Sequence, residues 1–246
     1  MLTQYNLKMP HAVYGGENAM DNITAIIKAR GAKKVAMFTD KGIEGAGLFA
    51  LPEEAVKASG AEYYVLDELP PEPSYMAVQK LVDEFKTSGA DLIVACGGGS
   101  VMDAAKLASV LVTDDYGVKE LLDNPGMAQK CVPIVLIPTT AGTGSEMSNA
   151  LVVTEGSTGR KLAVLADPAV SEYAVLNADL MLTLPAKMTI ACGLDAFCHA
   201  AEGYLSRMAS PVTDAICEKA MFLLYNYLPR AVANGQDREA RERVMV

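Results

Sequence analysis

The sequence predicts an α/β fold, with a parallel sheet covered by helices on both faces, followed by the start of an all-α domain. Over the first three quarters of the chain, short apolar runs alternate with helix-like stretches. Continuous apolar strands separated by helices are typical of a parallel sheet that is buried on both faces. From about Thr183 onward the strand signal disappears. We therefore expect an α/β domain over residues 1–183 and an incomplete all-helical domain over residues 184–246.

Each element of the α/β domain follows from its local pattern. The predicted core strands are apolar runs that end in a polar turn, at residues 34–40, 62–69, 91–96 and 132–138. The predicted helices lie before or between these strands, at residues 19–30, 52–59, 74–88 and 100–112. Weaker apolar runs predict two further strands, at residues 149–154 and 174–177.

Proline and serine residues predict where the helices of the C-terminal region begin and end. Pro185 takes a first helical position and opens a helix to about residue 207. Ser210 opens a second helix, which we expect to stop before Pro229. A third helix begins near residue 236 and still runs at Val246 without a cap, so we expect that the chain was cut inside a longer helical domain. A natural end at a frayed helix is the alternative.

The composition limits the classes of function that the protein can have. The 246 residues are 51% hydrophobic and 21% charged, which indicates a soluble globular protein with a sizeable core. The formal net charge of −9 repels phosphate groups and therefore argues against nucleic acids and anionic membranes as partners. No apolar stretch approaches the roughly 18 residues of a membrane span, and no secretory signal is visible. Five cysteines without close metal-type pairs predict reduced thiols in a cytoplasm.

A glycine-rich turn is the sharpest local signal. Gly97, Gly98, Gly99 and Ser100 follow an apolar strand and open a predicted helix. Glycines let a ligand approach the backbone, and a helix N-terminus offers free N–H groups with a partial positive charge. This arrangement predicts a pyrophosphate site, although it is not the GxGxxG fingerprint of the first strand. A tight structural turn is the alternative interpretation.

A second polar loop follows the strand at 132–138. It contains glycines and small hydroxyl residues, which suit close contact with a nucleotide. The hydroxyl residues include Thr139, Thr140, Thr143 and Ser145. Loops at the carboxyl ends of parallel strands line the ligand crevice of such sheets. Two such loops at one sheet edge make a joint nucleotide site the better interpretation, and a loop that only caps the next helix is the alternative.

Asp40 ends the first predicted strand. A carboxylate at a strand end accepts hydrogen bonds from both ribose hydroxyls of an adenosine and repels a 2′-phosphate, which favours NAD over NADP. An Asx turn or a helix cap would place an aspartate at the same position, and that alternative stays open.

Asp195 and His199 are four residues apart on a predicted helix and therefore project from one face. Carboxylate oxygen and imidazole nitrogen are good ligands for iron or zinc, but two donors make an incomplete site. A surface ion pair is the alternative. The other histidine, His11, lies in the N-terminal segment, and nothing in the sequence joins it to this pair.

Five segments carry a resemblance to a known family. They are Thr39-Asp40-Lys41-Gly42, GGGSVMDAAK (97–106), PTTAGTGSEMSNALVVTE (138–155), GRKLAV (159–164) and GLDAFCHAAEGY (193–204). In this order and spacing they resemble the iron-containing (group III) alcohol dehydrogenases. The resemblance covers essentially the whole chain and implies a Rossmann-type, dehydroquinate synthase-like domain before an all-helical one.

The resemblance also assigns roles to residues. It implies that Gly98, Gly99 and Ser100 hold the cofactor pyrophosphate, that Asp40 contacts the adenosine ribose, and that Lys161 reaches the cofactor. The second loop would line the cofactor pocket with Thr139, Thr140, Thr143 and Ser145. Asp195 and His199 look like the first two of four metal ligands, Fe²⁺ or Zn²⁺ being the metal. The family's other two ligands are histidines that would lie beyond residue 246, and Glu72-Pro73 replaces an Asn-Pro pair found in many relatives.

The resemblance implies reversible hydride transfer between a small alcohol and NAD, with the metal polarising the carbonyl oxygen. No general acid or base is visible apart from the metal ligands. A cytoplasmic homodimer is expected. Two alternatives remain: a glycerol dehydrogenase-like or dehydroquinate synthase-like enzyme of the same fold, and a non-catalytic nucleotide-binding fragment.

Overall fold

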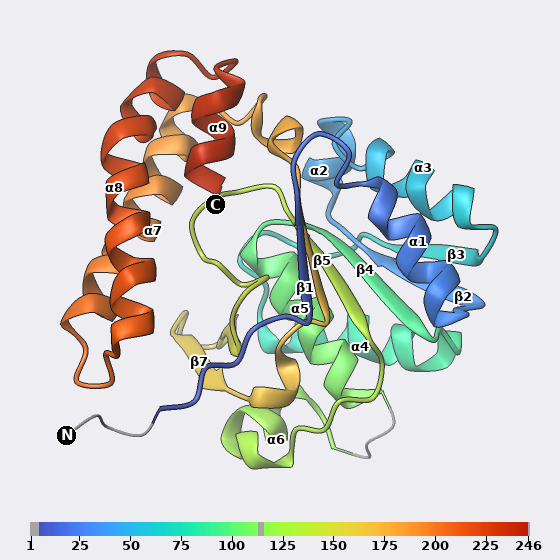
Figure 1. The fold of residues 1–246 in the computed structure, drawn as a ribbon. Coiled ribbons are helices and arrows are strands. Elements are labelled where there is room, and N and C mark those ends of the chain that lie inside the picture. The colour runs from blue at the N-terminus through green and yellow to red at the C-terminus, as the bar shows by residue number, and fades with distance from the viewer. Residues whose placement is uncertain (1–4, 113–115, 246) are drawn as a thin grey trace. The chain divides into compact units, whose positions relative to one another are not determined.

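The computed structural model describes residues 5–112 and 116–245 of the chain (Figure 1). These residues divide into two compact units. The sheet unit consists of Lys8–Pro138 and Ser145–Val175. The helical unit consists of the chain from Leu176 onward, the loop Thr139–Gly144 and the N-terminal residues up to Leu7.

The sheet unit is built on a six-stranded sheet, as the apolar runs predict. The strand order is β1-β8-β5-β4-β2-β3, and each pair from β8 to β3 is parallel. In that order the strands are Ala12–Gly15, Tyr173–Leu176, Ile134–Pro138, Leu92–Gly97, Lys34–Phe38 and Glu62–Leu66. The predicted parallel α/β architecture is confirmed.

Alternate residues of each central strand pack on opposite faces of the sheet. In β2, Ala36 and Phe38 belong to a core that also contains buried residues of α4 (Tyr75–Ser88) and α5 (Gly99–Leu111). Val35 and Met37 alternate with them and are equally buried. On that second face lie α1 (Asp21–Arg30) and α3 (Ala50–Ser59), which pack on each other and bury residues such as Ile23 and Val56. Burial on both faces is the reason that these strands are continuous apolar runs.

Two strands were not predicted from the sequence, and a third, which was predicted, belongs to a separate sheet. The edge strand β1 has four residues that alternate between exposed and half-buried, so it lacks an apolar run. The predicted strand at 149–154 exists as β6 (Ala150–Thr154), but it pairs antiparallel with β7 (Lys161–Leu165) in a separate two-stranded sheet. The unpredicted β7 is an exposed, alternating strand that only this pairing defines.

The predicted helices of the sheet unit are confirmed with small shifts at their ends. Two short helices, α2 (Lys41–Gly45) and α6 (Val118–Asp123), were not predicted, because five or six residues are too few for a periodic signal. Three 3₁₀ turns complete the description, at Pro125–Met127, Asp167–Ala169 and Ala178–Met181. In the described residues no helix is both long and apolar enough to cross a bilayer.

The helical unit contains α7 (Ala186–Leu205), α8 (Pro211–Ala233) and α9 (Arg238–Met245), and Figure 1 shows them side by side. Two glycines let α7 and α8 approach closely. A Cβ at Gly193 would collide with Leu228, and one at Gly203 would lie 3.0 Å from the Cys217 sulfur. Small residues at these positions therefore set the separation of the two helices.

The predicted end of the second helix before Pro229 is wrong. Helix α8 continues through Pro229 to Ala233. Proline removes one backbone hydrogen bond and crowds the preceding turn, at a cost of about 3 kcal/mol in a helix interior. The residues that follow Pro229 are nevertheless held in place. Ala231 is fully buried, and Arg230 forms ion pairs with Asp237 at 3.0 Å and Glu239 at 2.8 Å.

A buried arginine fastens α9 to the start of α7. The Arg241 guanidinium donates to Thr189 Oγ1 at 2.6 Å, to the Leu184 carbonyl at 2.8 Å and to the Gly235 carbonyl at 3.0 Å. Burial lowers the pKa of Arg241 from its ordinary value. The three hydrogen-bond acceptors compensate the buried positive charge.

Candidate functional site

The strand order locates a ligand crevice in the sheet unit. From β2 the chain runs outward to β3 and then returns across β2 to form β4, so the direction of winding reverses between β2 and β4. Ligands of open parallel sheets bind outside the carboxyl ends of the strands at such a switch point. Asp40 follows β2, and Gly98 follows β4 directly. The topology thus brings the two strongest sequence candidates to neighbouring strand ends.

The N-terminus of α5 is open to an anion. Gly98 is the N-cap residue, with extended backbone and no side chain to cap the helix. Gly98 and Gly99 are half-buried, and Ser100 is exposed. At Gly97 a Cβ would lie 2.7 Å from Val101, so the last residue of β4 must be glycine for α5 to start where it does. Free N–H groups and the helix dipole together suit a phosphate or pyrophosphate group.

Asp40 is a helix cap. One of its carboxylate oxygens, Oδ1, accepts a hydrogen bond from the Ile43 backbone N–H at 3.0 Å, which starts α2. A Cβ at Gly42 would lie 2.9 Å from the same oxygen, so Gly42 makes room for the cap. The helix cap, which the sequence analysis left open as an alternative, is therefore present. A ribose hydroxyl would have to bind the Asp40 carboxylate in addition to the Ile43 N–H.

The cation next to Asp40 is already neutralised. The Lys41 ammonium donates to the Asp67 carboxylate and lies 3.6 Å from both Glu44 and Glu68. The hydrogen bond to Asp67 raises the pKa of Lys41. Three carboxylates thus surround one ammonium beside Asp40, and such a field opposes a 2′-phosphate.

The buried hydroxyl of Thr39 has no hydrogen-bond partner among the described residues. Thr39 lies between β2 and Asp40, at the carboxyl edge of the sheet. Buried polar atoms are nearly always paired with protein, water or a ligand. An uncapped helix N-terminus, a strand-end carboxylate and an orphaned hydroxyl at one edge fit a dinucleotide.

The second loop packs on α7 within the helical unit. Thr139 is buried, Thr140 is half-buried and Thr143 is exposed. A Cβ at Gly142 would lie 3.1 Å from the Cα and carbonyl oxygen of Cys192, so only a glycine allows this approach. Cys192 lies about one helical turn before Asp195 on α7. The loop and the candidate metal ligands therefore lie on the same side of this helix.

Ser145, a predicted cofactor residue, is buried in the sheet unit. Its hydroxyl donates to Asp103 Oδ1 at 2.5 Å. Asp103 and Lys106 are functional candidates that the sequence reasoning did not single out. Their signal was present: two charged residues at i, i+3 in a helix whose other side chains are apolar or small, inside GGGSVMDAAK.

Lys161 is the first residue of β7, and its exposed ammonium lies 3.6 Å from Glu72. Glu72 has a φ of +49°, the only non-glycine residue with positive φ in the part of the chain that the structure describes. The Glu72 carboxylate therefore partly neutralises the charge of Lys161. An exposed pair of this kind contributes little stability.

Asp195 and His199 face each other on α7. The His199 Nε2 and Asp195 Oδ1 atoms are 3.8 Å apart, and about half of each side chain is exposed. Their donor types fit a divalent metal ion, but residues 5–112 and 116–245 contain no cluster of three or more such donors. Burial raises the pKa of the nearby Cys192 thiol, and Asp195 raises it further, so Cys192 stays protonated.

Two sequence profiles of one protein family match the chain. A sequence profile described as iron-containing alcohol dehydrogenase matches residues 10–178, and the profile of the C-terminal part of the same family matches residues 189–246. The chain is 35% identical over 237 residues to the NAD-dependent methanol dehydrogenase of Bacillus methanolicus, covering 96% of this chain and 62% of that protein.

Solved structures show the same fold. A 1,3-propanediol oxidoreductase superimposes with a TM-score of 0.93 at 30% identity, covering 99% of this chain and 64% of the other. The sulfoacetaldehyde reductase of Bifidobacterium kashiwanohense in complex with NAD⁺ gives 0.91 at 29% identity, with the same two coverages. The chain thus spans less than two thirds of the length of these relatives. On the matched profiles, the identity and the fold, it belongs to the iron-containing alcohol dehydrogenase family.

Proposed function

We propose that the chain forms the cofactor-binding part and the first metal-binding helix of an NAD-dependent oxidoreductase that interconverts a small alcohol with its aldehyde or ketone. One observation carries the proposal: the uncapped N-terminus of α5 and the carboxylate of Asp40 follow neighbouring parallel strands at the switch point of the sheet. The names of the relatives support it, since one is an NAD-dependent methanol dehydrogenase and another was solved with NAD⁺.

We assign the cofactor to residues 1–183. The pyrophosphate would accept hydrogen bonds from the N–H groups at Gly98, Gly99 and Ser100, and the adenosine ribose would donate to Asp40. We also propose a cofactor role for Thr139, Thr140, Thr143 and Lys161, because their motifs resemble those of the family. The acidic surroundings of Lys41 support NAD over NADP, because a 2′-phosphate would meet uncompensated carboxylates.

We assign Asp195 and His199 as two ligands of a divalent metal ion, Fe²⁺ or Zn²⁺, in residues 184–246. Such an ion, when bound, supplies Lewis-acid polarisation of a carbonyl oxygen. The two side chains orient it from adjacent turns of one helix, and His199 must be neutral to bind. The residues of this chain supply position and charge, and the nicotinamide supplies the hydride chemistry.

A second candidate function is nucleotide binding without catalysis. The observation in its favour is the count of metal donors: two on α7, with no cluster of three or more His, Cys, Asp or Glu side chains anywhere in the described parts of the chain. A site with two protein ligands chelates a metal weakly.

Two measurements on the purified chain test both candidates. Fluorescence titration with NADH and NADPH should give tighter binding of NADH. Metal analysis after dialysis, together with an NADH-linked aldehyde-reduction assay, then decides on catalysis. Binding of NADH without metal or turnover supports the second candidate for this chain, and failure to bind NADH contradicts both.

The subunit and compartment assignments belong to the same proposal. The five cysteines are free thiols in the structure, which supports a reducing compartment such as a cytoplasm. Sedimentation of the purified chain tests the expected homodimer.

A further inference from the structure

Thr39 carries a buried hydroxyl group at the carboxyl end of β2. The residue is 1% exposed, and its backbone N–H donates to the Leu66 carbonyl at 3.0 Å, which continues the pairing of β2 with β3. Its Oγ1 atom has no hydrogen-bond partner among the described residues. A buried hydroxyl loses its bonds to water when the chain folds, and here no protein group replaces them.

Packing alone does not account for a hydroxyl at this position. Val35 and Met37 lie on the face of the sheet that α1 and α3 cover, and the two-residue period of a strand places the Thr39 side chain on the same face. Ala36 and Phe38 belong to the core on the other face. A valine at position 39 would have nearly the same shape, would also suit a strand and would bury no polar atom. Departures of this kind from local packing rules are typical of functional sites.

Cys96 is the neighbour of Thr39 across the switch point of the sheet. In the parallel pair of β2 and β4, Phe38 lies opposite Ala95, so the next residues along the two strands are Thr39 and Cys96. Cys96 is fully buried, and burial raises the pKa of its thiol to about 12, with a further contribution from Asp40. A protonated thiol is only a weak hydrogen-bond acceptor, so it does not satisfy the hydroxyl.

The proposed function assigns the cofactor to residues that closely follow Thr39 and Cys96. Asp40 comes directly after Thr39, and Gly98 comes two residues after Cys96. Asp40 and Gly98 are half-buried, whereas Thr39 and Cys96 are buried, and all four belong to the sheet unit. The unpartnered hydroxyl therefore lies at the base of the crevice, beneath the groups proposed to bind the ribose and the pyrophosphate. Ribose and phosphate oxygens are acceptors that such a hydroxyl lacks.

We propose that Thr39 is a further cofactor-binding residue, whose hydroxyl donates to an oxygen of the adenosine diphosphate half of the dinucleotide, directly or through one ordered water. The inference rests on the proposed function. It predicts two effects that rarely occur together. Removal of the hydroxyl should weaken cofactor binding without lowering the stability of the free protein, because in the free protein this hydroxyl bonds to no protein group.

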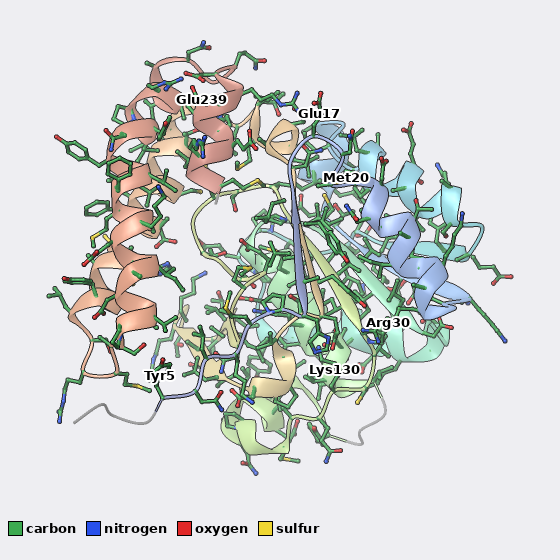
Figure 2. The ribbon with its side chains drawn as sticks, viewed as in Figure 1. Tyr5, Glu17, Met20, Arg30, Lys130 and Glu239 are labelled. Atoms are coloured by element: carbon green, nitrogen blue, oxygen red, sulfur yellow. The ribbon has the colours of Figure 1, made fainter. Side chains whose placement is uncertain are left out.

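Thr24 provides a matched control on the same face of the sheet. It belongs to α1, and Figure 2 shows Met20 and Arg30 at the two ends of this helix. The Thr24 hydroxyl donates to the Ala55 carbonyl of α3 at 2.6 Å. The same substitution at Thr24 therefore removes a hydroxyl that has a protein partner, whereas at Thr39 it removes one that has none.

The experiment compares Thr39→Val with Thr24→Val by thermal melting without ligand and by calorimetric titration with NADH and with ADP. Thr39→Val should raise the Kd for NADH by about fivefold and the Kd for ADP by the same factor, as loss of one hydrogen bond to the ligand would do. Its melting temperature should equal or exceed that of the unmodified chain. Thr24→Val should melt earlier, and its Kd for NADH should change by less than about twofold.

Two further variants separate the hydroxyl from the shape of the side chain. Thr39→Ser keeps the hydroxyl, so its Kd should stay within about twofold of that of the unmodified chain. Thr39→Ala should raise the Kd as Thr39→Val does, and it replaces the valine variant if that variant does not fold. An unchanged Kd for NADH in the variants without the hydroxyl would overturn the proposal. Absence of NADH binding by the unmodified chain would instead overturn the proposed function.

Discussion

The sheet unit and the helical unit differ in how far each one buries its own apolar side chains. Every residue of β4 and β5 is buried, and α5 is buried along all of its length after Ser100. In the helical unit, Leu205 is 81% exposed, Met208 is 87% exposed and Tyr225 is 78% exposed. The contrast extends to the sites, because the sheet unit offers several groups to a dinucleotide and α7 offers two donors to a metal.

This contrast indicates that the two parts of the proposed activity, cofactor binding and metal binding, can be separated. A site built on fully packed strands keeps its geometry without help from a ligand. A pair of half-exposed side chains on one helix has no such support. We therefore expect cofactor binding and metal binding to respond independently to mutation.

The largest effect is expected at the glycine turn. Gly99→Val places a branched side chain on the first residue of α5, where the proposed pyrophosphate must approach the backbone. Affinity for NADH should fall by about a hundredfold, while the melting temperature falls only slightly, because Gly99 already has helical backbone. Calorimetric titration and melting of the same sample measure both. A large loss of stability with unchanged affinity would assign Gly99 to structure alone.

The next effect concerns the packing of α7 on α8 in the helical unit. Gly193→Ala puts a methyl group against Leu228 and should destabilise the α7–α8 packing by about 1–3 kcal/mol. Urea unfolding measures the change, with NADH titration alongside. The double variant Gly193→Ala, Leu228→Ala should be more stable than the sum of the two single effects. An unchanged free energy of unfolding would show that the α7–α8 packing has room for the methyl group.

Cofactor preference should shift at Asp40. Asp40→Asn keeps the cap on α2, since asparagine caps helices as well as aspartate does, but it removes the charge. The ratio of the NADPH to NADH dissociation constants should fall by about tenfold, equivalent to about 1.4 kcal/mol. Asp83→Asn, on the exposed side of α4, is the control. An unchanged ratio would leave Asp40 as a cap without a role in cofactor choice.

A smaller effect with a pH signature is expected at Glu146. Burial raises the pKa of this carboxyl, and its Oε2 atom has no hydrogen-bond partner among the described residues. A group with a raised folded-state pKa stabilises the fold below its unfolded pKa of about 4.3 and loses that contribution as pH rises through the folded value. Glu146→Gln should therefore raise the melting temperature at pH 7, and the gain should vanish near pH 4. A gain independent of pH would show that the charge plays no part.

The smallest effect on stability is expected at the candidate metal ligands. The Asp195–His199 pair is exposed, so replacing His199 with alanine should change the free energy of unfolding by less than about 0.5 kcal/mol. Binding of NADH should stay unchanged, and binding of Fe²⁺ or Zn²⁺ should be lost. His11→Ala is the matched control for metal binding. If His199→Ala retained metal as well as the unmodified chain, the ligand assignment would be wrong.

The parallel sheet, the glycine turn and the α7 pair were all predictable from the sequence, because each depends on local order. Apolar runs define β2, β4 and β5; a glycine triplet after a strand defines the start of α5; and a four-residue spacing puts Asp195 and His199 on one helix face. The strands β1 and β7 were missed because exposed, alternating strands are defined by their partners and not by their composition.

The sequence alone determined the central strands and the long helices, which loops carry glycines, and the family resemblance that these motifs express. Only the tertiary structure decided that α8 runs through Pro229 and that Lys106 and Asp103 hold the segment 145–152. The physical reason is one of range. Hydrophobic periodicity and turn chemistry act between near neighbours in the chain, whereas a buried charge is stable only where distant backbone groups converge on it.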